Sequence, residues 1–239
     1  MSIAENYQRI RAEIPSQVRI VVAAKGRTAD EVKEVIEAGA TDIGENYVQE
    51  AETVRQSLSQ DLIEKVNWHM IGPLQKNKIN KALPIFDFIQ TTDSLELAEA
   101  IDKRVENSGK GTIALMLEIN IGSELSKSGL KPEEHERFEE FLEKLIEDIS
   151  QLSRIRLEGL MTMGPLLAEP EQFRQYFHRT KEIFDRLAKL KLQQVNMKYL
   201  SMGMTDSYQI AIEEGANMVR IGTAIFGPRK DNCPLNLKR

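Results

Sequence analysis

The chain has 239 residues, of which 41% are hydrophobic and 29% charged, and its net charge is −5. This composition is typical of a globular protein, and the negative charge gives no basic footprint for binding nucleic acid. No apolar segment is long enough to cross a bilayer and the start of the chain lacks a secretory signal, so we expect a cytoplasmic protein without membrane contact.

Cysteine usage and the lack of linkers indicate a simple organisation. The one cysteine, Cys233, lies in a polar tail and can form no internal disulfide. No cluster of Cys and His has the spacing of a metal site, so we expect none. No linker or low-complexity segment divides the chain. We therefore predict one domain over residues 1–239, with a helix at 1–14 and a tail at 230–239.

Short β-branched runs alternate with helical patterns along almost the whole chain. The predicted strands are 18–24, 41–43, 66–71, 85–90, 112–119, 155–161, 196–200 and 217–221. Between them, Thr28 and Ser94 are expected to cap helices, Gly39 to close one, and Pro132 and Pro170 to open others. Eight strands separated by helices match a (β/α)₈ TIM-like barrel. An open doubly wound sheet is the alternative, but residues 25–28 are not its glycine-rich fingerprint.

Lys25 is the first candidate for chemistry, because it stands where the first predicted strand meets Gly26. In such barrels the carboxyl ends of the strands form the functional face. Burying an ammonium is costly unless it has a partner, and a neutral amine is what carbonyl chemistry requires. The alternative is a lysine whose head reaches solvent. We interpret Lys25 as a candidate Schiff-base residue.

The last two predicted loops carry a second signal. Ser201 and the residues up to Ser207 follow the seventh strand, and Gly222 and Thr223 follow the eighth. Loops at these positions often bind phosphate through backbone N–H groups. We also expect Asp206 or Ser207 to cap the next helix. Ordinary turn chemistry explains each hydroxyl alone, whereas both loops together favour a phosphate site.

Arg220 lies inside the eighth predicted strand, where a permanent charge needs a partner or a wet cavity. It can donate to a phosphate, a carboxylate or a ring nitrogen. The alternative is an ion pair with Glu118 or Glu158. His69 is expected to be either a ligand residue or a core histidine that donates to a backbone carbonyl. An amine, a phosphate cradle and an arginine match pyridoxal 5′-phosphate (PLP), although a sugar-phosphate aldolase fits nearly as well.

Six segments resemble one family. They are residues 44–50 (GENYVQE), 68–72 (WHMIG), 126–129 (SKSG), 159–161 (GLM), 200–204 (LSMGM) and 219–227 (VRIGTAIFG). In these segments the chain resembles the pyridoxal-phosphate homeostasis proteins, which are relatives of the amino-terminal barrel of alanine racemase. The similarity extends from about residue 18 to residue 229. Two positions depart from the family pattern: Pro73 replaces a common histidine, and Ala24 stands where serine is frequent.

The resemblance implies roles for particular residues. Lys25 holds PLP as a Schiff base, Ser201, Gly222 and Thr223 hold its phosphate, Arg220 meets the pyridine nitrogen, and Asn46 lies near the ring hydroxyl. Lys127 is a further lysine that reaches an anion or water. The resemblance also implies a non-catalytic protein that buffers PLP and delivers it, with PLP-dependent apoenzymes as possible partners.

A PLP-dependent amino-acid racemase is the alternative function. Racemases of this lineage resemble a barrel followed by a β-domain that supplies a second acid/base tyrosine, whereas here only about ten residues follow Arg229. An arginine at the ring nitrogen also disfavours its protonation, which weakens the ring as an electron sink. We therefore expect a carrier rather than an enzyme. A closed barrel has no free strand edges, so we expect a monomer.

Overall fold

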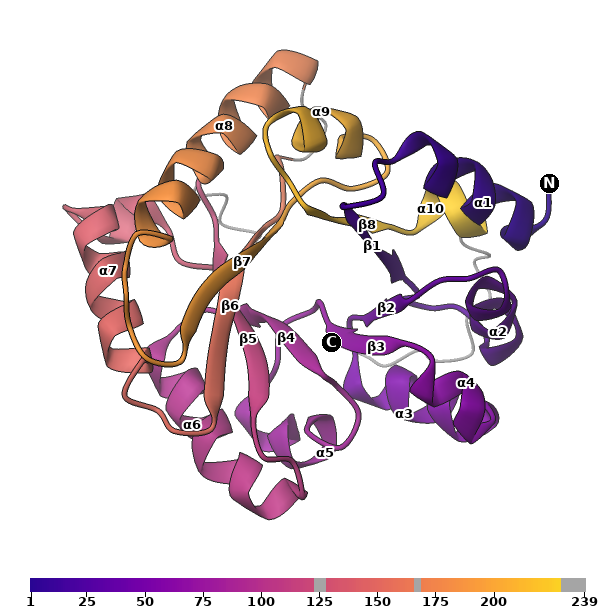
Figure 1. Ribbon diagram of the computed structural model, residues 1–239, viewed down its shortest axis with the longest axis horizontal. Coiled ribbons are helices and arrows are strands. Elements are labelled where there is room, and N and C mark those ends of the chain that lie inside the picture. Colours follow the sequence, from indigo (N-terminus) through magenta and orange to yellow (C-terminus); the bar gives the residue numbers. More distant parts are fainter. Residues whose placement is uncertain (123–127, 166–168, 229–239) are drawn as a thin grey trace.

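The computed structural model describes residues 1–122, 128–165 and 169–228, and in these ranges the strands form one closed parallel barrel in the order β1 to β8. Figure 1 shows the strands at the centre, with the helices arranged around them as an outer ring. The strands are β1 (Arg19–Ala23), β2 (Asp42–Glu45), β3 (Asn67–Met70), β4 (Phe88–Thr92), β5 (Ile113–Ile119), β6 (Ile155–Thr162), β7 (Val195–Ser201) and β8 (Met218–Ile221). The barrel prediction is confirmed.

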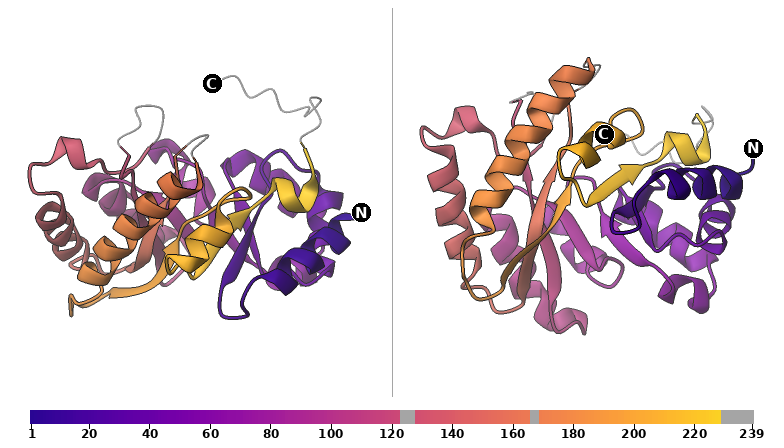
Figure 2. Two further views of the ribbon diagram at one scale, coloured as in Figure 1. Left: turned by 90° about the horizontal axis from the view of Figure 1, so that it is seen from above. Right: turned by 45° about the horizontal axis from the view of Figure 1, so that its top comes forward.

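The helices follow the strands along the chain. They are α1 (Ile3–Glu13), α2 (Ala29–Glu37), α3 (Val48–Ser57), α4 (Gln60–Glu64), α5 (Ile79–Ala82), α6 (Leu95–Val105), α7 (Phe138–Ile149), α8 (Pro170–Leu187), α9 (Tyr208–Glu213) and α10 (Thr223–Phe226). Short 3₁₀ helices cover Lys76–Lys78, Glu106–Ser108 and Pro132–Glu134. At its start the chain packs α1 beside α10, and the Asn6 side chain donates to the Ile225 carbonyl at 3.0 Å. Both helices lie on the same side of the barrel in Figures 1 and 2.

Local sequence signals set several helix boundaries. Thr28 and Glu31 form the expected capping box of α2, and Gly39 follows its end with a φ of +101°. Ser94 caps α6 by accepting from the Leu97 N–H. The prediction for Pro132 was wrong, because Pro132–Glu134 is a separate 3₁₀ turn, the chain is extended at His135, and α7 begins at Phe138.

Buried side chains form two sets that the strands separate. Most apolar side chains pack between the strands and the helices, as expected for a parallel sheet covered on its outer face. A smaller cluster fills the barrel interior and includes Val21, Phe88, Met116, Met161 and Tyr199. Because side chains alternate between the two faces of a strand, residues two positions apart from these also point inward.

One end of the interior is closed by an arginine between two rings. The Arg19 guanidinium lies 5.5 Å from the centre of the Phe88 ring and 5.2 Å from that of Tyr199. It also pairs with the buried Asp42 and donates to the Tyr199 hydroxyl at 2.9 Å. Arg19 begins β1, so this plug lies at the amino-terminal end of the strands. The opposite end, at the carboxyl termini of the strands, is the barrel mouth.

Candidate functional site

The register of β1 brings the predicted residues to one mouth. Ala23 pairs with Gly44 of β2, and Val22 pairs with Ile221 of β8. Consequently the turn that carries Lys25 lies between the loop with Asn46 and the loop with Gly222. Lys25 is partly exposed, and its Nζ lies 5.3 Å from the centre of the Tyr47 ring. The amine is therefore at the mouth and accessible to a ligand.

The turn that carries Lys25 is tied to the neighbouring loop. The Gly26 N–H donates to Glu50 Oε2 at 3.0 Å, and the Arg27 N–H donates to the Ala24 carbonyl at 2.9 Å. These bonds fix the backbone on the carboxyl side of Lys25. A fixed turn limits the positions that the lysine amine explores, so the turn holds it over the mouth.

Glu45, the residue before Asn46, is a buried carboxyl group next to this turn. It is fully buried, and neither side-chain oxygen has a hydrogen-bond partner among the described residues. Burial and the nearby charge of Glu50 raise its pKa to about 8, against a small opposing effect of the Asn46 backbone. Glu45 is therefore mostly protonated at neutral pH, which avoids repulsion between its carboxyl group and that of Glu50.

The loops after β7 and β8 meet at the mouth, and we call these two loops together the cradle. The Arg220 N–H donates to the Gly203 carbonyl at 3.0 Å, and the Ala224 N–H lies 3.4 Å from Thr205 Oγ1. Gly203 has a φ of +90°, which favours glycine. A Cβ at position 222 would lie 2.9 Å from the Ala23 carbonyl oxygen, so Gly222 permits the close approach of the loop after β8 to the end of β1, two residues before Lys25.

Thr205 is the residue of this cradle that sequence reasoning did not single out. Its hydroxyl faces the start of α10, where Thr223 is exposed. The hydroxyl belongs to a loop of several polar residues, and only its contact with the other loop distinguishes it. By contrast, Ser207 does not cap α9 with its side chain, because its hydroxyl accepts from the Met204 N–H at 3.2 Å.

Arg220 points into the barrel interior and is held by described hydrogen bonds. Its Nη1 donates to the Ser201 carbonyl at 2.9 Å and to Ser201 Oγ at 2.7 Å, and its Nη2 donates to the Thr162 carbonyl at 2.7 Å. Burial lowers its pKa to about 10, although Glu118 opposes this. Arg220 remains a cation at neutral pH. It forms no ion pair among the described residues, and Glu158 pairs with Arg156 instead.

Ser201, the last residue of β7, is bonded to other interior side chains. It is fully buried, and its hydroxyl donates to Gln90 Oε1 at 2.7 Å while accepting from Arg220. The contact with phosphate that the sequence analysis expects of Ser201 stays a prediction.

Two further polar side chains, Glu118 and Thr92, each carry an unsatisfied oxygen atom. Glu118 pairs in register with the inward-facing Met161, whereas a register shift in β4 pairs Thr92 with Leu117 of the outer layer. Glu118 Oε2 and Thr92 Oγ1 are both buried and have no partner among the described residues. Burial raises the pKa of Glu118 to about 7, opposed by Arg220. The unpaired Oε2 of the inward-facing Glu118 fits a polar ligand or water in the interior.

His69 is a core histidine, as one of the two sequence-based expectations had it, but its partners differ from those expected. It is a fully buried histidine whose Nε2 lies 2.9 Å from Asp42 Oδ1 and whose Nδ1 lies 2.9 Å from Gln90 Nε2. Its ring stacks on Phe88 at 4.6 Å. Side chains rather than a backbone carbonyl are its partners. Lys127 and Cys233 lie outside the described residues.

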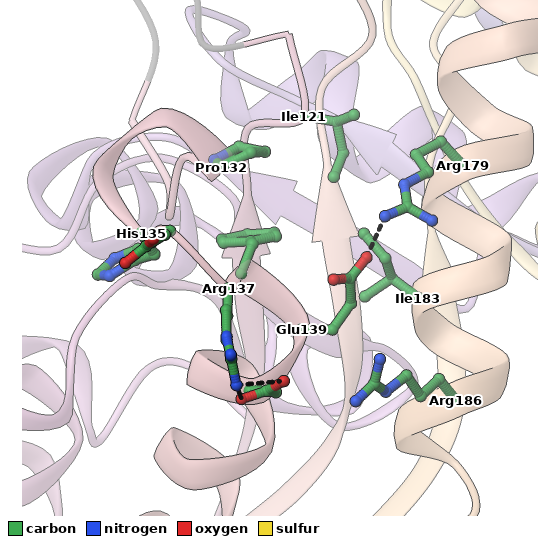
Figure 3. Close-up of a pocket in the computed structure, with 11 residues that line it drawn as sticks. Ile121, Pro132, His135, Arg137, Glu139, Arg179, Ile183 and Arg186 are labelled. Atoms are coloured by element: carbon green, nitrogen blue, oxygen red, sulfur yellow. Dashed lines mark hydrogen bonds and ion pairs between the residues drawn. The ribbon is translucent and has the colours of Figure 1, made fainter.

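A separate cavity of about 380 Å³ lies between α7 and α8, away from Lys25 (Figure 3). Arg137 pairs there with Glu140, Arg179 with Glu139, and Arg186 with Glu143. Because carboxylates already pair with these arginines, the cavity does not favour binding of an anion.

Within the described ranges, no group of His, Cys, Asp or Glu could hold a metal ion, and no helix is long and apolar enough to cross a membrane.

Comparison with known proteins places the chain in a family. Residues 1–230 match the family described as alanine racemase, N-terminal domain. A protein of Pseudomonas aeruginosa named pyridoxal phosphate homeostasis protein is 36% identical over 98% of both chains. The protein of the same name from Escherichia coli K12 is 33% identical, over 95% of this chain and 97% of its own.

Solved structures agree with this assignment. PipY of Synechococcus elongatus PCC7942, solved without PLP, has a TM-score of 0.85 and 31% identity, over 95% of this chain and 100% of its own. The structure of PipY with PLP bound has a TM-score of 0.82. An alanine racemase of Bacillus anthracis shares the fold, with a TM-score of 0.71 and 20% identity, and this chain covers 56% of it. The chain therefore belongs to the alanine racemase N-terminal domain family and, within it, to the pyridoxal phosphate homeostasis proteins.

Proposed function

We propose that this protein binds PLP reversibly at the barrel mouth, with Lys25 as the covalent attachment point, and that it buffers and delivers the cofactor without catalysing a reaction on it. The observation that carries the proposal is the convergence of three groups on one mouth. They are the amine of Lys25, the backbone cradle of Gly222 and Thr223, and the buried guanidinium of Arg220. The names of the relatives and the PLP bound to PipY support the same ligand.

Each polar group of the ligand has a matching residue. The Gly222 and Thr223 N–H groups and the Thr205 hydroxyl are suited to the phosphate, since N–H groups at a helix start favour anions. Arg220 is suited to the ring nitrogen, and Asn46 to the ring hydroxyl. In this proposal Ser201 contributes by holding Arg220 in place.

The chemistry that PLP supplies is a reversible carbonyl reaction. Lys25 would hold the cofactor through its amine, and PLP would supply an aldehyde that condenses with an amine with loss of water and is set free again by hydrolysis. A cation at the ring nitrogen disfavours its protonation, which suits storage of the cofactor better than carbanion chemistry. Release by hydrolysis makes PLP-dependent apoenzymes the proposed recipients.

The test is to incubate the full chain with PLP, reduce it with borohydride, and map the modified lysine by mass spectrometry. We expect a yellow protein whose colour is lost on reduction, with the added mass on Lys25. A reduced adduct on another lysine, such as Lys127, would contradict the proposed attachment point. A protein that takes up no PLP would contradict the function itself.

Catalytic alternatives are separated by two assays. A racemase of the same family fold would invert the stereochemistry of L-alanine or L-serine, and we expect no inversion above background. A Schiff-base aldolase would trap a sugar phosphate on Lys25 without binding PLP. The racemase structures share under 25% identity with this chain, so their likeness supports the fold and not their reaction.

A further inference from the structure

A line of hydrogen bonds crosses the barrel interior beneath the mouth and ends at Arg220. Its members are buried, each at most 5% exposed, and come from five strands: Arg220 of β8, Ser201 of β7, Gln90 of β4, His69 of β3 and Asp42 of β2. The successive donor–acceptor distances are 2.7, 2.7, 2.9 and 2.9 Å. The line therefore joins Arg220 to the buried carboxylate of Asp42 by way of β7, β4 and β3.

The Asp42 end of the line sets the direction of its bonds. Burial opposes the charge of Asp42, but hydrogen bonding and charge from His69 and Arg19 lower its pKa overall. Asp42 is thus an ionised acceptor, and His69 Nε2 must carry the proton that it donates to Asp42. Burial lowers the pKa of His69 despite the opposing effect of Asp42, so the ring is neutral and its Nδ1 accepts.

The remaining directions follow from the neutral histidine. Gln90 Nε2–H donates to His69 Nδ1, which turns Gln90 Oε1 toward Ser201. The Ser201 hydroxyl donates to that oxygen, so its lone pairs face Arg220 and accept from Nη1. These amide and ring orientations are assigned from the hydrogen-bond network, in which every donor has an acceptor. Reversing any member would place two donors or two acceptors face to face.

Arg220 depends on this direction because it has few described partners. A buried guanidinium is costly unless hydrogen bonds satisfy it, and the described ones come from Ser201 and the Thr162 carbonyl. If Gln90 could not accept, the Ser201 hydroxyl would lose its acceptor and rotate. Its oxygen would then no longer be oriented toward Arg220. Small displacements of a positioned group have large effects on binding.

We propose that Gln90 and His69 are positioning residues that act through Ser201 to hold Arg220 against the ring nitrogen, and that they thereby slow the release of PLP. This inference rests on the proposed function. Neither residue needs to touch the cofactor, since both lie further along the line than Ser201. Their effect passes entirely through the orientation of the serine hydroxyl.

The test compares Gln90→Met with Thr91→Val. Methionine keeps the length of glutamine and removes both hydrogen-bonding groups. Thr91 is the matched control, because it is the next residue of β4, is 3% exposed, and donates one buried hydrogen bond to the Gly72 carbonyl at 2.8 Å. Each full chain is loaded with PLP. The readouts are the absorbance spectrum across pH, the rate of PLP release on dilution, and the melting temperature.

We expect Gln90→Met to release PLP about tenfold faster and to shift the apparent pKa of the bound chromophore, as loss of one bond to a charged group implies. Thr91→Val should lower the melting temperature and leave release within about twofold of the wild type, because its bond is neutral and off the line. His69→Gln, which keeps a donor toward Asp42 and removes the acceptor facing Gln90, should lie between them.

Distinct results separate the two proposals. If Gln90→Met matches Thr91→Val in release and spectrum, the line is only structural and the inference is overturned. If Gln90→Met does not fold, His69→Gln decides the question by the same comparison with Thr91→Val. A wild-type chain that forms no adduct on Lys25 overturns the proposed function instead, whatever the variants do.

Discussion

The space inside the barrel and the layer outside it are both buried, but they are built from different residues. The outer layer contains most of the apolar core. The interior carries a line of polar and charged groups and the unsatisfied Oε2 of Glu118. The difference indicates that the helix–strand layer supplies most of the stability. The interior can then hold groups that would be costly in an ordinary core, and these are the groups that a ligand requires.

The largest expected effect concerns the mouth alone. Lys25→Ala should abolish the borohydride-stable adduct, because no other amine is expected to reach the aldehyde, while the phosphate cradle retains weaker binding. Mass spectrometry after reduction measures the adduct. Lys33→Ala, on the exposed face of α2, is the control and should retain the full adduct. An undiminished adduct in Lys25→Ala would show that PLP is attached to another lysine and would contradict the proposed site at the mouth.

The second prediction tests the outer layer. Leu142 of α7 is fully buried against the strands, so Leu142→Ala should cost about 2–5 kcal/mol of unfolding free energy. Its PLP release rate should stay near that of the wild type, because α7 lies outside the barrel interior. Denaturant titration and dilution-driven release measure the two quantities. If Leu142→Ala lowered the unfolding free energy and also accelerated PLP release by a comparable free energy, the outer layer and the interior would not have separate roles.

The third prediction concerns Glu45, an exception to the apolar surroundings of the strands. Its folded pKa of about 8 exceeds the ordinary value of 4.5, so the folded state binds the proton more tightly than the unfolded state. Its contribution to stability is therefore present below pH 4.5 and is lost as the pH rises toward 8. Glu45→Gln should remove this loss and be more stable relative to wild type at pH 8 than at pH 5.

Urea titrations at the two pH values measure this difference. Glu118, whose pKa of about 7 is raised in the same direction, is unchanged in the variant and contributes equally to both proteins. A stability difference that is the same at pH 5 and pH 8 would show that Glu45 is ionised in the folded protein.

The smallest expected effect tests the anion cradle. Thr205→Val should weaken PLP binding by about three- to tenfold, through loss of one hydroxyl hydrogen bond to the phosphate. Binding of pyridoxal, which has the aldehyde and lacks the phosphate, should not change. Spectrophotometric titration with both aldehydes supplies the comparison. Equal weakening for the two aldehydes would place Thr205 outside the cradle.

Much of the fold follows from local sequence. All eight predicted strands are present in the structure, because burial of both strand faces favours short β-branched and apolar runs. The fourth shows the limit of this signal, since the run begins at residue 85 but β4 begins at Phe88. Pro132 shows another: the ring of His135 stacks on Phe141, a contact that local helix signals do not encode.

The site is predictable where chemistry and strand ends coincide, as for Lys25 and Gly222. A site residue is harder to predict from sequence where its role depends on a partner that is distant along the chain. Gln90 meets Ser201 across 111 positions, and nothing in its own segment indicates that contact. The same holds for the unsatisfied oxygen of Glu118, which follows from the lack of a partner in three dimensions.

The arginine plug at the amino-terminal end of the strands determines from which end a ligand can reach the barrel interior. Arg19 lies between the Phe88 and Tyr199 rings and closes the amino-terminal end of the barrel interior, so a ligand can enter only from the carboxyl end of the strands. Under the proposed function, PLP, the water that hydrolyses its adduct and any acceptor protein would share one entrance. An acceptor docked on that entrance would shield the cofactor from bulk water at the moment of hand-over.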